Sequence, residues 1–170
     1  MTPLVLLALT LGVPPGDPEI SALLESASLA PLRASTTVQA ARVDNYLPPR
    51  DKVPVDAESL QLPGVFRVRK SPITLRSADA AKLRAVLKRP SSYSSLVSAC
   101  MFEPGVAFTF PVRDDLMLLI CFKCREVAFV KGTQVLSKLS LSNGGRQGLW
   151  EASTKVFPEL RKDPRPAVER

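Results

Sequence analysis

Histidine is absent from this sequence of 170 residues, and only three residues are cysteine. Histidine is the usual general base and the commonest metal ligand among the side chains. A Ser-His-Asp or Cys-His mechanism is therefore excluded. Aromatic residues are also few, at 6%, and no run of them is interleaved with basic residues, as a base-stacking surface requires. Nucleic acid is therefore not an expected partner.

Acidic residues are fewer than basic residues, which gives the chain a net charge of +7. The basic residues are scattered rather than gathered in one stripe, and their clusters are Arg67, Arg69 and Lys70; Lys82, Arg84, Lys88 and Arg89; and Arg161, Lys162, Arg165 and Arg170. This distribution is typical of a basic face in contact with solvent. The partner is unknown from the sequence, and an envelope protein or an acidic surface are the candidates.

No lysine or arginine precedes the apolar run at residues 1–13. The run is too short for a transmembrane segment, which needs about 20 residues, but its length suits the apolar region of a signal peptide. Ala8, Thr10 and Gly12 match the small-residue cleavage pattern only weakly. We expect residues 1–16 to be a signal peptide or a disordered N-terminus, and the protein to be periplasmic or secreted. The other interpretations are a mis-set start codon and an N-terminal strand of the domain.

The chain is long enough for one hydrophobic core, and 45% of its residues are apolar. We expect a single domain over residues 17–160 and a basic flexible tail over residues 161–170. Periodicity and turn residues predict helices at 17–29, 77–89, 92–99 and 147–157, and strands at 35–43, 64–75, 106–112, within 116–130, and at 135–141. This order predicts an α+β fold with a mostly antiparallel sheet of about five strands and helices packed on one face.

Two further local patterns favour structural roles. Asn143, Gly144 and Gly145 precede the closing helix and are expected to form a turn or cap, because a lone glycine pair is weak support for an anion site. Trp150 has helical spacing with Phe157 and is expected in the core.

The three cysteines have the spacing C-x20-C-x2-C. If residues 116–124 form one extended strand, Cys121 and Cys124 lie about 10 Å apart and point to opposite faces. That separation is too large for a disulfide bond. A redox C-x-x-C works at the start of a helix, where a thiol pKa is lowered, whereas both flanks here resemble strands. Thioredoxin-like chemistry is therefore disfavoured, and Cys121 is left as a candidate reactive thiol.

A hairpin with a loop at residues 113–115 would pair apolar residues: Val112 with Leu116, Phe108 with Ile120, and Val106 with Phe122. The same register sets Cys124 opposite Pro104, a few residues from Cys100. We therefore expect a disulfide between Cys100 and Cys124, with Cys121 on the other face beside Ala107. A bulge or tight turn at residues 122–123 would make Cys121 the partner of Cys100 instead.

A metal site is the alternative use of Cys100, Cys121 and Cys124. Structural zinc needs four ligands, and Glu103 and Glu126 are the nearest acidic residues in the sequence. Three thiolates with one carboxylate would be an unusual set. The sequence therefore predicts no metal and no cofactor.

The segments 100–108 (CMFEPGVAF) and 118–124 (LLICFKC), followed by a strand and a closing helix, resemble a family of small exported bacterial proteins of uncharacterised function. The similarity covers about residues 64–158, and its most specific part is the L-x-x-C-F-x-C run. The resemblance implies export and an α+β fold, and it transfers no catalytic residue.

Together these observations predict an exported small globular protein that acts as a non-catalytic binding or structural module of the bacterial envelope. The alternative is a thiol-based redox protein or a zinc-stabilised module.

Overall fold

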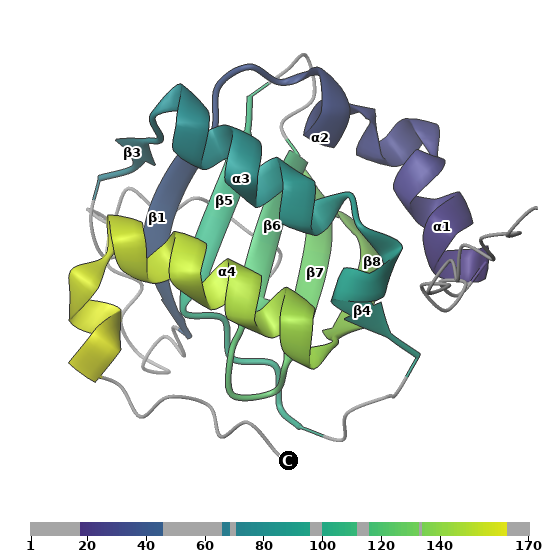
Figure 1. The fold of residues 1–170 in the computed structure, drawn as a ribbon. Coiled ribbons are helices and arrows are strands. Elements are labelled where there is room, and N and C mark those ends of the chain that lie inside the picture. The colour runs from purple at the N-terminus through teal and green to yellow at the C-terminus, as the bar shows by residue number, and fades with distance from the viewer. Residues whose placement is uncertain are drawn as a thin grey trace, which may run out of the picture.

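The computed structural model describes residues 18–45, 66–68, 71–95, 100–111, 116–132 and 134–162. These residues form an α+β fold, as predicted (Figure 1). The helices are α1 (Pro18–Glu25), α2 (Ala30–Ala34), α3 (Ser77–Leu87) and α4 (Asn143–Val156), with the short 3-10 helices η1 (Ala27–Leu29), η2 (Pro90–Ser92) and η3 (Pro158–Lys162). The strands are β1 (Gln39–Asn45), β2 (Phe66–Val68), β3 (Ile73–Thr74), β4 (Tyr93–Ser94), β5 (Val106–Phe110), β6 (Leu116–Cys121), β7 (Glu126–Lys131) and β8 (Gln134–Leu141).

All described strand pairs are antiparallel, and the sheet order is β2-β1-β5-β6-β7-β8-β4, with β3 also paired to β1. The prediction of about five strands was wrong. Residues 64–75, predicted as one strand, contain the short strands β2 and β3, and residues 116–130 contain two strands, β6 and β7. Strand β4 has only two residues, too few to show alternation in the sequence. The helix predicted at residues 92–99 was also wrong, because Tyr93 and Ser94 form β4 at one edge of the sheet.

The main core lies between the helices and the sheet. Figure 1 shows α3 and α4 lying across one face of the central strands. Their buried residues Leu83, Leu87 and Leu149 share one apolar cluster with Phe108 and Phe129 of the sheet. The helices therefore bury apolar surface that the strands alone would expose to water.

A second apolar cluster occupies the opposite face of the sheet and consists of Val43, Ala107, Met117, Leu119, Ala128 and Val130. Every residue of β6 is buried. Strands with two buried faces read as continuous apolar runs instead of alternating ones, which accounts for the unbroken apolar stretch after residue 116. None of the helices in the described ranges has the length and apolar character needed to cross a bilayer.

Helix α4 begins four residues earlier than predicted. The Oγ of Ser142 accepts a hydrogen bond from the backbone N–H of Gly145 at 3.1 Å and caps the helix. Gly145 lies in the first turn, against η2, and a Cβ built on it would lie 1.9 Å from the carbonyl oxygen of Ser92. Trp150, further along α4, is buried and packs edge-on against Phe122, with ring centroids 5.0 Å apart. The glycine thus allows the helix to begin in contact with η2.

Candidate functional site

The connection between β6 and β7 is a tight turn at residues 122–125, and Cys121 pairs directly with Glu126 across it. Arg125 has a φ of 58°, which places it in the left-handed region. Residues 116–124 therefore do not form one extended strand, and the alternative of a tight turn at residues 122–123 holds. Glycine, asparagine and proline, the usual turn residues, are absent from this turn, and the polar residues Lys123 and Arg125 are the signal that could have located it.

The register of the β5–β6 hairpin also differs from the prediction. Phe108 pairs with Leu118 and Val106 pairs with Ile120, whereas the predicted register pairs Phe108 with Ile120. Leu116 pairs with Phe110, and Val112, its predicted partner, lies outside the described residues. Because β5 ends at residue 110 and β6 begins at residue 116, the connection is longer than the three residues assumed. The shift of two residues keeps every side chain on its expected face.

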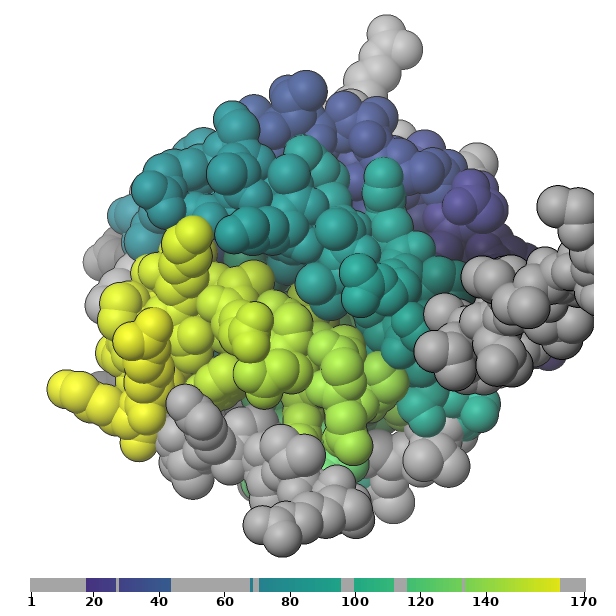
Figure 2. Space-filling model, viewed as in Figure 1, coloured from purple at the N-terminus to yellow at the C-terminus, as the bar shows by residue number. Residues whose placement is uncertain are grey.

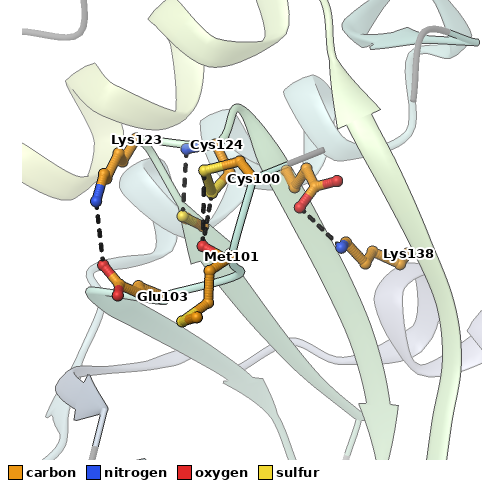
Figure 3. The surroundings of a disulfide bond; sticks show 8 residues. Cys100, Met101, Glu103, Lys123, Cys124 and Lys138 are labelled. Atoms are coloured by element: carbon orange, nitrogen blue, oxygen red, sulfur yellow. Dashed lines mark hydrogen bonds and ion pairs between the residues drawn. A yellow bond between two sulfur atoms is a disulfide. The ribbon is translucent and has the colours of Figure 1, made fainter. Parts of the chain in front are cut away.

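The turn brings Cys124 to Cys100. Their Sγ atoms are 2.02 Å apart and their Cα atoms 5.4 Å apart, which is disulfide geometry (Figure 3). The carbonyl oxygen of Met101 lies 2.8 Å from the sulfur of Cys124. The bridge ties the segment that precedes β5 to the β6–β7 turn. A turn in this place was expected to select Cys121 as the partner of Cys100, and the structure selects Cys124 instead.

Cys121 is a buried free cysteine next to this bridge. Its Sγ accepts a hydrogen bond from the backbone N–H of Cys124, with 3.3 Å between the two atoms. Cys121 lies two residues after Leu119, the register partner of Ala107, and therefore on the same face of the sheet. Because of the turn, Cys121 and Cys124 are not separated by an extended strand.

An ion pair with one buried partner lies beside Cys121, which is the register partner of Glu126. Glu126 has a side chain that is 4% exposed, and its Oε2 is 2.9 Å from Nζ of Lys138 in β8. The Lys138 side chain is 43% exposed, and its Nζ lies 5.4 Å from the ring centroid of Phe102. Sequence reasoning identified Glu126 as an acid near the cysteines but missed Lys138, which only the β7–β8 register brings close.

The acidic residues considered as metal ligands have cationic partners. Glu103 forms an exposed ion pair with Lys123 at 3.5 Å, and Glu126 pairs with Lys138. In the disulfide form, two of the three thiols are not free to bind a metal. The described residues contain no group of three or more acidic or cysteine side chains placed to hold a metal ion.

A cavity of about 470 Å³ adjoins the ion pair at the β8 edge of the sheet. Its walls come from α1, the end of β4, β7 and β8, and the lining residues are Glu19, Ile20, Leu23, Ser94, Ser95, Glu126, Ser137, Lys138, Leu139 and Ser140. The lining combines apolar side chains, serine hydroxyls and charged groups. The cavity therefore offers apolar contacts together with hydrogen-bonding and charged groups.

A smaller cavity of about 240 Å³ lies between α3 and α4, which form neighbouring bands of side chains in Figure 2. Asp79 in α3 pairs with Lys155 of α4 and with Arg76, whose Nε lies 3.0 Å from the carboxylate. The hydrogen bond from Lys155 is the main cause that holds the pKa of Asp79 below its ordinary value. The ion pair between Asp79 and Lys155 therefore links α3 to α4.

Comparison of the chain with protein-family models, with curated proteins and with solved structures finds no match. The resemblance to exported bacterial proteins therefore stays a prediction.

Proposed function

We propose that the protein is exported from the bacterial cytoplasm and acts as a binding or structural module that one disulfide stabilises. The observation that carries this proposal is the disulfide distance between Cys100 and Cys124. Disulfide bonds persist in oxidising compartments such as the periplasm and the extracellular space, and they are rare in the cytosol. The apolar N-terminal run and the family resemblance in the sequence support the same compartment.

The cavity at the β8 edge supports binding over a purely structural role. Burying a charged group such as the Glu126 carboxylate, even with a cation beside it, is often no better for stability than burying an apolar residue of similar volume. A charged pair in the wall of a cavity can, in contrast, orient a ligand. The cavity is therefore the proposed binding site.

The experiment that tests this function combines intact mass, thiol alkylation and metal analysis on protein purified without reductant. We expect one disulfide, mapped by peptide analysis to Cys100 and Cys124, one slowly alkylated cysteine at Cys121, and no stoichiometric metal. Removal of the N-terminal apolar segment from the protein recovered from the periplasm or the medium would support export. Three free thiols with bound zinc would contradict the proposal and favour a zinc-stabilised module.

A second candidate function is thiol-based redox chemistry, which the hydrogen bond between Cys124 N–H and Cys121 Sγ favours. In the exchange step, a local opening exposes the buried Cys121 thiol to water, the thiol loses its proton to water, and the thiolate attacks Sγ of Cys124. A Cys121–Cys124 bond forms, the Cys100–Cys124 bond breaks, and Sγ of Cys100 leaves as a thiolate. The number of disulfides is unchanged, so this step needs no oxidant.

Alkylation under native conditions separates the two candidates. Exchange predicts that Cys100 becomes alkylated with time while a Cys121–Cys124 disulfide accumulates, and that Cys121→Ser abolishes both. A binding or structural role predicts that Cys100 stays protected in the wild-type protein and in Cys121→Ser alike.

A further inference from the structure

Strand β8 has a partly unpaired outer edge. It pairs with β7 along its length, but β4 pairs only with Ser140 and Leu141. In the part of the chain that the structure describes, residues 134–139 have no strand on that side. Their side chains are exposed or half-buried, in contrast to the almost fully buried strands β5 to β7. A row of unpaired backbone groups is a template for another extended chain.

Two backbone hydrogen bonds show which peptide groups face outward. The N–H of Leu141 donates to the carbonyl of Arg125 on the β7 side at 2.6 Å, and the N–H of Ser142 donates to the carbonyl of Ser92 on the outer side at 3.0 Å. Because successive residues of a strand direct their peptide groups to alternate sides, those of Ser140 and Lys138 face outward. Ser140 lies opposite Ser94 of β4, so Lys138 is the first outward residue beyond that pairing.

The cavity of about 470 Å³ lies along this same stretch of β8. On the helix side of the sheet, its wall includes Ile20 and Leu23 of α1, both of which contact the main core, together with Leu139. On the opposite face are Lys138 and Glu126, since Glu126 alternates along β7 with Ala128 and Val130 of the second cluster. The edge is therefore apolar on the helix side of the sheet and charged on the opposite side.

We propose that this edge binds an extended peptide segment of a partner protein, which adds as a strand in line with β4. Consecutive residues of such a strand point to opposite faces. One residue of the peptide is apolar and contacts Ile20 and Leu23, and its neighbour is acidic and faces Lys138. The inference rests on the proposed binding function and names the partner class for that cavity.

Charge and shape support this choice of partner. The Lys138 side chain is 43% exposed, so a second carboxylate can approach it from solvent. The register of β7 and β8 shifts between Phe129 and Val130, and such a bulge restricts regular pairing to a short segment. A second copy of β8 is a poorer occupant, because it would bring another Lys138 to the same edge and because bulges and lysines oppose edge-to-edge pairing.

The test is NMR titration of the full-length protein, labelled with nitrogen-15, with the peptide Ac-Thr-Leu-Glu-Leu-Thr-NH2. Two control peptides accompany it: one with N-methylated glutamate, and one with lysine in place of glutamate. We expect saturable amide shifts at residues 94–95 and 137–140 with the first peptide. We expect none with the N-methylated peptide, because it lacks a main-chain donor, and about two- to fivefold weaker binding of the lysine peptide, as for a partly exposed ion pair.

A variant tests the role of the charge without leaving a buried carboxylate unpaired. Glu126→Gln combined with Lys138→Met removes both charges, and we expect it to bind the glutamate and lysine peptides equally.

Equal shifts with the N-methylated peptide, or no shifts at millimolar peptide, would overturn strand addition. Shifts at residues 137–140 that depend on protein concentration without peptide would assign the edge to a second copy. Each of these failures leaves the disulfide and export measurements untouched, so the proposed compartment and the partner class are tested separately.

Discussion

The Nζ of Lys138 in β8 lies 2.9 Å from Oε2 of Glu126 in β7, and this carboxylate is buried beside the cysteine cluster. The pair links the disulfide-bearing turn to the edge of the sheet that we propose as a binding site. Its energetics are testable by substitution.

Lys138→Met is expected to lower the free energy of unfolding by about 1–3 kcal/mol, because it leaves the Glu126 carboxylate buried without a cation. The double variant Glu126→Gln/Lys138→Met should lose less than this single variant, since both charges are removed together. Urea unfolding followed by circular dichroism measures all three proteins. If the double variant is less stable than Lys138→Met, the unpaired Glu126 carboxylate is not what destabilises the single variant.

Reduction of the disulfide is expected to lower the free energy of unfolding by about 3 kcal/mol, the typical value for a loop of this size. Cysteines 100 and 124 are separated by 24 positions in the sequence. The variant Cys121→Ser gives the cleanest comparison, because it cannot undergo thiol–disulfide exchange. It is unfolded once with reductant and once without. Identical unfolding curves in the two conditions would show that the bridge is either absent or without effect on stability.

Gly145→Ala is expected to lower the free energy of unfolding by at least about 2 kcal/mol, as for overpacking of a rigid contact. The new Cβ would lie 1.9 Å from the carbonyl oxygen of Ser92, and η2 or α4 must move to avoid it. The neighbouring Gly144→Ala is the matched control, because the nearest atom to its Cβ is 4.0 Å away. Alanine favours a helix over glycine by up to about 1 kcal/mol, so this control should be neutral or stabilised. Thermal unfolding that ranks the two variants in the reverse order would contradict the close approach of α4 and η2.

Arg125→Gly should be more stable than Arg125→Ala by about 1 kcal/mol, because a side chain with a Cβ is disfavoured at positive φ. The φ of Arg125 is 58°. Comparing glycine with alanine removes the contribution of the arginine side chain, which both variants lose. At Lys123, in the same turn but without a positive φ, the comparison should not favour glycine. Chemical unfolding of the four variants, with glycine or alanine at residue 125 or 123, measures both differences. If Arg125→Ala is more stable than Arg125→Gly, residue 125 does not have a positive φ and the turn is wrong.

The contribution of Asp79 to stability should disappear in acid. Its pKa is lowered, chiefly by the hydrogen bond from Lys155, from an ordinary value of 3.8. A lowered pKa in the folded protein means that the stabilisation is fully present above 3.8 and is lost as the pH falls through the folded pKa. Asp79→Asn should therefore be less stable than the wild type at neutral pH, and the difference should narrow below pH 3.8. If the difference in free energy of unfolding between Asp79→Asn and the wild type stays the same above and below pH 3.8, Asp79 does not form these ion pairs.

Local patterns located the elements whose signals are themselves local. Helix α3 begins at Ser77, as predicted, because the helical spacing of its apolar residues and the acidic Asp79 in its first turn lie within one segment. Strand β5 begins at Val106, as predicted from the alternation of apolar residues with other residues. Gly132, with a φ of 56°, lies between the segments 116–130 and 135–141 in which strands were predicted. The α+β class follows from the order of these segments.

The candidate site depended on contacts between distant segments. In the apolar stretch that contains β6 and β7, both faces are buried, so periodicity does not mark where one strand ends at Cys121 and the next begins at Glu126. The sequence alone determined that three thiols, without histidine, lie in the second half of the chain. The tertiary structure decided that Cys124 meets Cys100 and that Lys138 meets Glu126. The physical reason is that strand register and turn position are set by packing and hydrogen bonds between strands, and not by any one strand's own residues.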